Sequence, residues 1–167
     1  MKSHLVPWIV VFALVALGCT REEANNQSRY SIHTNFASKI VLESYAVTEL
    51  RGHTYLVLTW RAPNDTPRNA YTLFVHAIDK DGKVLFQFDH ELLNARGMPT
   101  SVWKQEVVKD VFQITPPTGH APGKCTLRIG LFTPGSSRGL DVYSTDLPTP
   151  TDGWRAWAVL LENINCR

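Results

Sequence analysis

The chain has 167 residues, with 17 Lys and Arg against 15 Asp and Glu, and a formal net charge of +2. It contains no basic run of five or more residues, so the composition argues against a nucleic-acid partner and against electrostatic membrane binding. Without the N-terminal segment described next, about 150 residues remain, enough for one domain with a sizeable core and rarely enough for two.

The N-terminal segment has the order of features typical of a secretory signal. Met1-Lys2-Ser3-His4 gives a positive end, and the apolar run 5–17 leads to Gly18-Cys19. The run is shorter than the ~20 apolar residues that a membrane-spanning helix needs. Removing residues 1–18 takes away one basic residue, Lys2, and no acid, which leaves the mature chain close to neutral.

Ala16-Leu17-Gly18-Cys19 resembles the lipobox of bacterial lipoproteins, with Ala16 where leucine is commoner. The resemblance implies that residues 1–18 are a lipoprotein signal peptide and that Cys19 carries diacylglycerol and a further acyl chain such as palmitate. Several acyl chains anchor stably, because each buried methylene adds ~0.8 kcal/mol. We therefore expect a cell-envelope protein tied to membrane lipid on the exported side. Thr20 stands where aspartate often signals inner-membrane retention, which favours the outer membrane weakly if there are two.

The polar stretch that follows predicts a lipidated flexible tether over residues 19–37, ahead of a single domain over 38–167. From Lys39 onward, apolar residues alternate with polar ones and turn residues interrupt the pattern at short intervals. Eight strands are expected in chain order, at 40–50, 54–62, 70–79, 83–92, 106–114, 125–132, 140–143 and 155–163. Asp81-Gly82 between the third and fourth predicts a hairpin with a type I′ turn.

Short strands at this spacing predict an all-β fold, an antiparallel immunoglobulin-like β-sandwich of seven to eight strands. A jelly roll is the main alternative.

Part of the chain also resembles an immunoglobulin-like module found in exported bacterial proteins and at the ends of some dolichyl-phosphate-mannose-type membrane glycosyltransferases. The matching features, over roughly 54–133, are Phe74-Val75-His76, Asp81-Gly82, Asp89, Trp103 and Pro122-Gly123-Lys124-Cys125-Thr126-Leu127. The module usually has tyrosine where this chain has Cys125, and the loop 93–103 and the last strand also depart from it. The resemblance implies the fold and a non-catalytic role.

Two cysteines remain once Cys19 is acylated, an even number in an oxidising compartment. A disulfide between Cys125 and Cys166 would close a loop of about 40 residues and contribute roughly 4 kcal/mol in the chain-entropy model. The alternative is two separate buried thiols.

The expected hairpin places His76 opposite Gln87, with Asp89 diagonal to it on the same side of the sheet. Asp110 interrupts an inward apolar row on the next strand, so His76, Asp89 and Asp110 are a candidate polar cluster. We interpret the cluster as structural, because a buried carboxylate needs a donor. A metal site or a small hydrolase around His76 is the alternative. No metal-ligand spacing and no Gly-x-Ser-x-Gly elbow occurs, so we expect no metal, no cofactor and no enzyme.

The tryptophans give the best indication of binding. Trp60 and Trp157 fall on apolar faces of expected strands and are assigned to the core, whereas Trp103 and Trp154 lie in expected loops. A loop indole can stack on a sugar ring or contact a partner, or fold back over the open end of the sandwich. Arg96, Arg138 and Arg155 are candidate hydrogen-bond donors beside such a platform.

The leading hypothesis is a tethered, non-catalytic binding or assembly module that contacts an envelope protein or other envelope component through loops at one end. The alternative is a carbohydrate-binding module that uses Trp103 and Trp154 for a glycan.

Overall fold

A computed structural model describes residues 27–63, 67–119 and 123–166, which form ten β-strands and one short 3₁₀ helix. The elements in chain order are β1 (Gln27–Phe36), β2 (Ile40–Leu50), β3 (His53–Arg61), β4 (Thr72–Ile78), β5 (Val84–Gln87), β6 (His90–Glu91), η1 (Thr100–Val102), β7 (Val107–Ile114), β8 (Gly123–Phe132), β9 (Val142–Thr145) and β10 (Val159–Cys166). Within these ranges no helix is long and apolar enough to cross a bilayer. Cys19 and the expected signal peptide lie outside the described residues.

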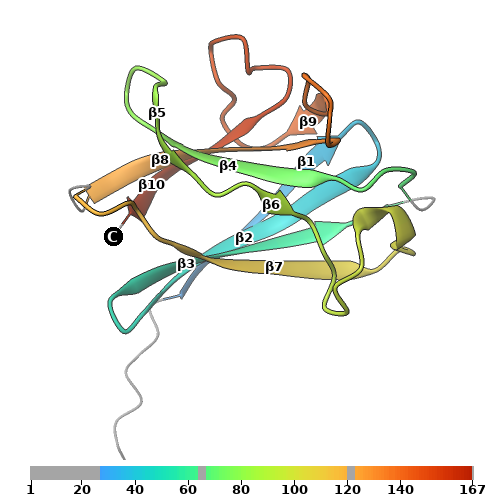
Figure 1. Cartoon of the computed structure of the whole chain (residues 1–167), viewed down its shortest axis with the longest axis horizontal. Helices are drawn as coiled ribbons and strands as arrows, with labels where there is room; N and C mark the ends of the chain where they lie inside the picture. The colour runs from blue at the N-terminus through green and yellow to red at the C-terminus, as the bar shows by residue number, and fades with distance from the viewer. Residues whose placement is uncertain (1–26, 64–66, 120–122, 167) are drawn as a thin grey trace, which may run out of the picture.

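The strands form two antiparallel sheets that lie one over the other (Figure 1). The first, here called the β3 sheet, has the order β7-β3-β2-β1-β9. The second, the β4 sheet, has the order β10-β8-β4-β5, and β6 also pairs with β4. The predicted antiparallel β-sandwich is therefore confirmed.

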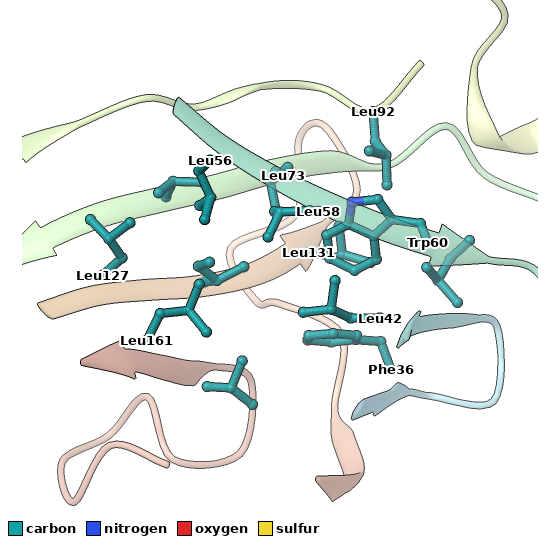
Figure 2. Packing of buried hydrophobic residues seen from close by; sticks show 14 of the residues in the cluster. Phe36, Leu42, Leu56, Leu58, Trp60, Leu73, Leu92, Leu127, Leu131 and Leu161 are labelled. Atoms are coloured by element: carbon teal, nitrogen blue, oxygen red, sulfur yellow. The ribbon is translucent and has the colours of Figure 1, made fainter. Parts of the chain in front are cut away.

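The core lies between the sheets, where the alternation of each strand turns one face inward. The row predicted on β3 (Leu56, Leu58 and Trp60) and the row predicted on β8 (Leu127, Ile129 and Leu131) are both fully buried. Figure 2 shows the leucines of both sheets meeting, with Phe36 and Leu42 close to the indole of Trp60. Each such side chain contributes about 1.5–3 kcal/mol through removal from water.

The predicted tether is wrong for residues 27–36, which form β1 between β2 and β9. A polar residue, Thr34, occupies a buried position here, and the register shifts between Ser31 and Thr34, so the sequence lacks a clean alternation. Thr34 is buried because its Oγ1 shares a 2.7 Å hydrogen bond with Thr145 Oγ1 on β9. The sandwich therefore begins well before residue 38.

Ten strands replace the seven to eight that were predicted. Besides β1, the extra strand arises because the expected strand at 83–92 divides into β5 and β6. The break falls at Phe88 and Asp89, where Phe88 N donates to Val75 O at 2.9 Å and Asp89 Oδ1 accepts from Val75 N at 3.3 Å.

The hairpin at Asp81-Gly82 has the predicted register, with His76 paired to Gln87, but not the predicted turn. Gly82 has φ +79°, whereas Asp81 has no positive φ, and Gly82 N donates to Asp79 O at 3.1 Å. This pattern is a type I turn followed by a glycine in the left-handed region. Positive φ at both central residues occurs instead in two other turns: between β1 and β2, at Ala37 (52°) and Ser38 (56°), and between β2 and β3, at Arg51 (50°) and Gly52 (79°).

Cys125 on β8 and Cys166 on β10 form a disulfide, with 5.9 Å between their Cα atoms. The two strands are neighbours in the β4 sheet, and Cys125 is directly beside Ile164 in the register. The covalent bond therefore fastens the last strand to the body of the sheet.

Candidate functional site

Trp103, one of the two candidate binding tryptophans, is fully buried and belongs to the core. Its indole Nε1 donates to Met98 O at 3.2 Å. The preceding turn is fixed because Thr100 Oγ1 accepts from Tyr71 N at 2.9 Å and donates to Asn69 O at 2.8 Å. A side chain held inside the core cannot meet a ligand, so the ligand-binding prediction for Trp103 is wrong.

The outer face of the β4 sheet, turned away from the core, carries a second aromatic layer. Leu73 and Val75 on β4 point into the core, so Phe74 and His76 between them lie on the outer face. The same alternation on β8 puts three residues on this face: Arg128, Gly130 and Phe132. The rings of Phe74 and Phe132 lie 6.4 Å apart between centroids.

The segment between β9 and β10 folds over this outer face, on the side away from the β3 sheet (Figure 1). Trp154 meets Phe74 at 5.4 Å and His76 at 5.6 Å between ring centroids, in edge-to-face geometry. Arg128 is buried, with only 2% of its surface exposed. Its guanidinium lies 4.9 Å from the centre of the Trp154 ring, and its Nη2 donates to Gly82 O at 2.7 Å. Trp154 is therefore held over the sheet by aromatic and cation–π contacts.

Trp157 also belongs to this outer layer, and its assignment to the core is wrong. It lies in the turn before β10, where its N donates to Trp154 O at 2.9 Å, and the two indoles are 6.1 Å apart. A Cβ on Gly139 would come within 2.9 Å of Trp157 Cβ, so the glycine allows the indole to lie this close.

A pocket of about 180 Å³ opens between this segment and the loop after β8. Four aromatic residues and five polar or charged residues line it, and apolar surface with placed polar groups is usual for a small-molecule site. It is lined by Phe74, His76, Asp89, Phe132, Ser136, Ser137, Arg138, Gly139, Trp154 and Trp157.

His76 and Asp89 supply one polar wall of the pocket. His76 Nε2 lies 3.3 Å from Asp89 Oδ1, and this oxygen also accepts from Val75 N at 3.3 Å. His76 Nδ1 and Trp157 Nε1 are buried and have no hydrogen-bond partner among the described residues. Buried polar atoms without partners are uncommon in folded proteins, and two of them border this one pocket.

Arg138 forms another wall. Its guanidinium lies 5.6 Å from the centre of the Trp157 ring and donates from Nη2 to Asp141 Oδ1 at 2.6 Å. The side chain is 60% exposed, so it can turn toward a ligand at little cost. The loop is shaped by Ser136, whose Oγ donates to Arg138 O at 2.8 Å.

Asp110 does not join His76 and Asp89, so the predicted three-residue cluster is wrong in part. Its Oδ2 lies 3.0 Å from Nε2 of His90, a residue that the sequence analysis did not single out. This hydrogen bond raises the pKa of His90 above its ordinary value, mainly through the Asp110 carboxylate and against the effect of burial. The pair joins β6 to β7 between the two sheets and does not line the pocket.

Of the predicted arginines, only Arg138 lines the pocket. Arg96 lies 3.8 Å from Glu106, and Arg155 is an exposed residue in the turn ahead of β10. Across the described ranges, no three His, Cys, Asp or Glu side chains are grouped so as to hold a metal ion.

One feature of β4 could have indicated the pocket residues that the sequence analysis missed. β4 is buried at six of its seven positions, so both of its faces are covered. A strand of this kind requires a second layer outside the sheet. The sequence did not show that the segment carrying Trp154 and Trp157 supplies that layer.

Comparisons with known proteins find no match: no family model, no curated protein and no solved structure is significantly similar to the chain.

Proposed function

We propose that the chain is an exported lipoprotein, anchored through acylated Cys19, whose immunoglobulin-like β-sandwich is a non-catalytic binding module. The pocket formed by Trp154, Trp157 and the outer face of the β4 sheet is its binding site, for a small ligand that contains a ring. The observation that carries this proposal is the pocket itself, an aromatic recess of about 180 Å³ on the outside of the sandwich.

The cell-envelope address rests on the sequence Ala16-Leu17-Gly18-Cys19 and is supported by the disulfide between Cys125 and Cys166. Disulfides persist in oxidising compartments outside the cytoplasm and are rare inside it.

A binding role is supported by how the aromatic side chains are arranged. Trp154 and Trp157 pack over the outer face of the sheet but leave a recess between them and the loop 133–139, which Ser136, Ser137 and Arg138 border. A ligand that fills the recess would remove exposed aromatic surface from water and meet fixed polar groups at its edge.

A hydrolase at this site is less well supported, although His76, Asp89 and two serines line the same pocket. A nucleophilic serine needs a base nitrogen within hydrogen-bond reach. His76 Nε2 faces Asp89, its Nδ1 is buried, and Ser136 Oγ donates to a backbone carbonyl, so His76 and Ser136 are not arranged as a base and its nucleophile.

Two measurements test the proposal. Intact-mass analysis of the membrane fraction should show a mature chain that begins at Cys19 and carries diacylglycerol and a further acyl chain. Cys19→Ser should remain uncleaved and lack the lipid. A thermal-shift screen of small ring compounds should give ligands that stabilise the wild type and not Trp154→Ala. An unlipidated mature chain would contradict the anchor, and stabilisation that survives in Trp154→Ala would place binding elsewhere.

A further inference from the structure

We propose that the ligand of the Trp154–Trp157 pocket is a single neutral sugar ring, such as the terminal unit of an envelope glycan. This inference rests on the proposed binding function and names its ligand class. Three features of the pocket lead to it: its size, its aromatic surface and the way its charges are paired.

The size of the pocket suits one six-membered ring. A cavity of about 150 Å³ accommodates benzene, and the volume here is about 180 Å³. The recess is open to solvent on one side, so the remainder of a longer chain could extend away from it. A long glycan laid along a flat surface would need an extended row of exposed aromatic rings, whereas here the rings converge on one recess.

The aromatic surface suits a ring with apolar faces. Phe74 and Phe132 form the base on the sheet, and Trp154 and Trp157 stand over it. A pyranose presents C–H groups on its faces and hydroxyl groups around its rim. Its faces can therefore lie against aromatic side chains while the rim stays hydrogen-bonded.

The charges argue for a neutral ligand, because every ionic group at the pocket already has a partner. Asp89 faces His76, and Arg138 is bound to Asp141 at 2.6 Å. Behind the pocket, Arg128 lies 3.8 Å from Asp152. A cation would meet the Arg138 guanidinium, which lies over the Trp157 indole, and an anion would meet the Asp89 carboxylate, so either would face like charge.

The polar atoms at the edge match a set of hydroxyl groups. His76 Nε2 and Val75 N both lie against Oδ1 of the Asp89 carboxylate, so a ligand hydroxyl can donate to Oδ2. The exposed Arg138 guanidinium can donate, and Ser137 lies beside it on the same wall. Hydrogen bonds from hydroxyl groups to an ionised carboxylate are about twice as strong as neutral ones, so Asp89 should fix the orientation of the sugar.

The test is a titration of the full chain, purified in a detergent without a sugar headgroup. The probes are the methyl glycosides of glucose, galactose, mannose and N-acetylglucosamine, with indole and choline as ring and cation controls that are not sugars. Binding is followed by tryptophan emission and by saturation-transfer NMR, which reports the ligand protons that contact aromatic rings. We expect saturable binding of at least one glycoside, with the strongest transfer to its ring C–H protons.

Variants locate the site. Trp154→Phe and Asp89→Asn should each weaken glycoside binding at least tenfold, whereas Tyr143→Ala, which removes a 64% exposed aromatic ring outside the pocket, should leave it unchanged. Trp154→Phe keeps an aromatic ring against Phe74 and His76, and a melting curve for each variant verifies its fold.

The outcomes separate the two proposals. Glycoside binding that both pocket variants weaken supports the inference, and glycoside binding that neither variant affects overturns it. If only indole or choline binds, and Trp154→Phe abolishes that binding, the sugar assignment is overturned but the proposed binding function stands. If none of the probes binds, the result counts against both the sugar assignment and the proposed binding function.

Discussion

Nε2 of His90 lies 3.0 Å from Oδ2 of Asp110, and these two residues join opposite sheets of the sandwich. His90 belongs to β6 and Asp110 to β7, at the edge where the rings of Phe88 and Phe112 also meet, 6.2 Å apart. The hydrogen bond is partly buried, and His90 Nδ1 is fixed by a contact of 2.9 Å with Phe88 O. One ionisable pair therefore closes this side of the core.

The first prediction concerns pH. The Asp110 carboxylate raises the pKa of His90 in the folded protein, with the nearby Asp89 adding to the effect. The stabilisation is therefore complete below about pH 6.5, the ordinary histidine pKa, and is lost as the pH rises through the higher folded value. We expect urea unfolding of the wild type to show about 1 kcal/mol less stability from this pair at pH 9 than at pH 5.5.

His90→Gln and Asp110→Asn should each flatten this part of the pH profile. The double variant should be no flatter than either single one, because both single changes remove the same interaction. An unchanged slope in His90→Gln would show that another group is responsible.

The second prediction concerns the disulfide. Cys125 and Cys166 are 41 residues apart, and the bond restricts a long loop in the unfolded chain. The double variant Cys125→Ser/Cys166→Ser should lose about 2–5 kcal/mol of unfolding free energy. The measurement is denaturant unfolding with and without reductant: the wild type should respond to the reductant and the double variant should not. A wild type indifferent to reduction would argue that the bond contributes little.

Much of the fold could be predicted because it follows from the alternation of apolar and polar residues along each strand. The inward rows of β3 and β8 were readable from the positions of leucine and tryptophan, and β2 has the predicted bounds. Even the pairing of His76 with Gln87 followed from the position of Asp81-Gly82, although the turn is of another type. Local sequence therefore sets strand identity and hairpin register.

The candidate site was harder to predict because it depends on contacts between distant segments. Trp103 and Trp154 both stand in Pro- and Thr-containing loops, yet one is enclosed in the core and the other packs on the outer face. Nothing in the local sequence distinguishes these two outcomes. Asp110 likewise pairs with His90 and not with His76, because β7, which carries Asp110, lies at the sheet edge opposite β6.

The third prediction concerns β1. It lies between β2 and β9, and its Phe36 is fully buried against Trp60, with 5.9 Å between the ring centroids. A chain that begins at residue 38 would expose this part of the core and leave β2 as an open edge. We expect it to aggregate or to lose its cooperative melting transition, whereas a chain that begins at residue 20 should melt like the wild type without its lipid. Cooperative unfolding of the shorter chain would restore the interpretation of 19–37 as a tether.

The fourth prediction uses a glycine to connect the fold with the pocket. A Cβ built on Gly130 would lie 2.3 Å from both Phe74 Cζ and the backbone O of Trp157, and neither the packed ring nor the backbone can move aside cheaply. Gly130→Ala should therefore cost about 1–3 kcal/mol through overpacking and should push Trp157 outward, so that ligand binding and the emission of the pocket tryptophans both change. Gly123→Ala is the matched control, because Gly123 lies on the same strand and a Cβ there has no neighbour within 4 Å. The measurements are melting curves and tryptophan emission spectra of the two variants. If Gly130→Ala and Gly123→Ala have the same stability and emission, Trp157 is not held against the sheet at Gly130.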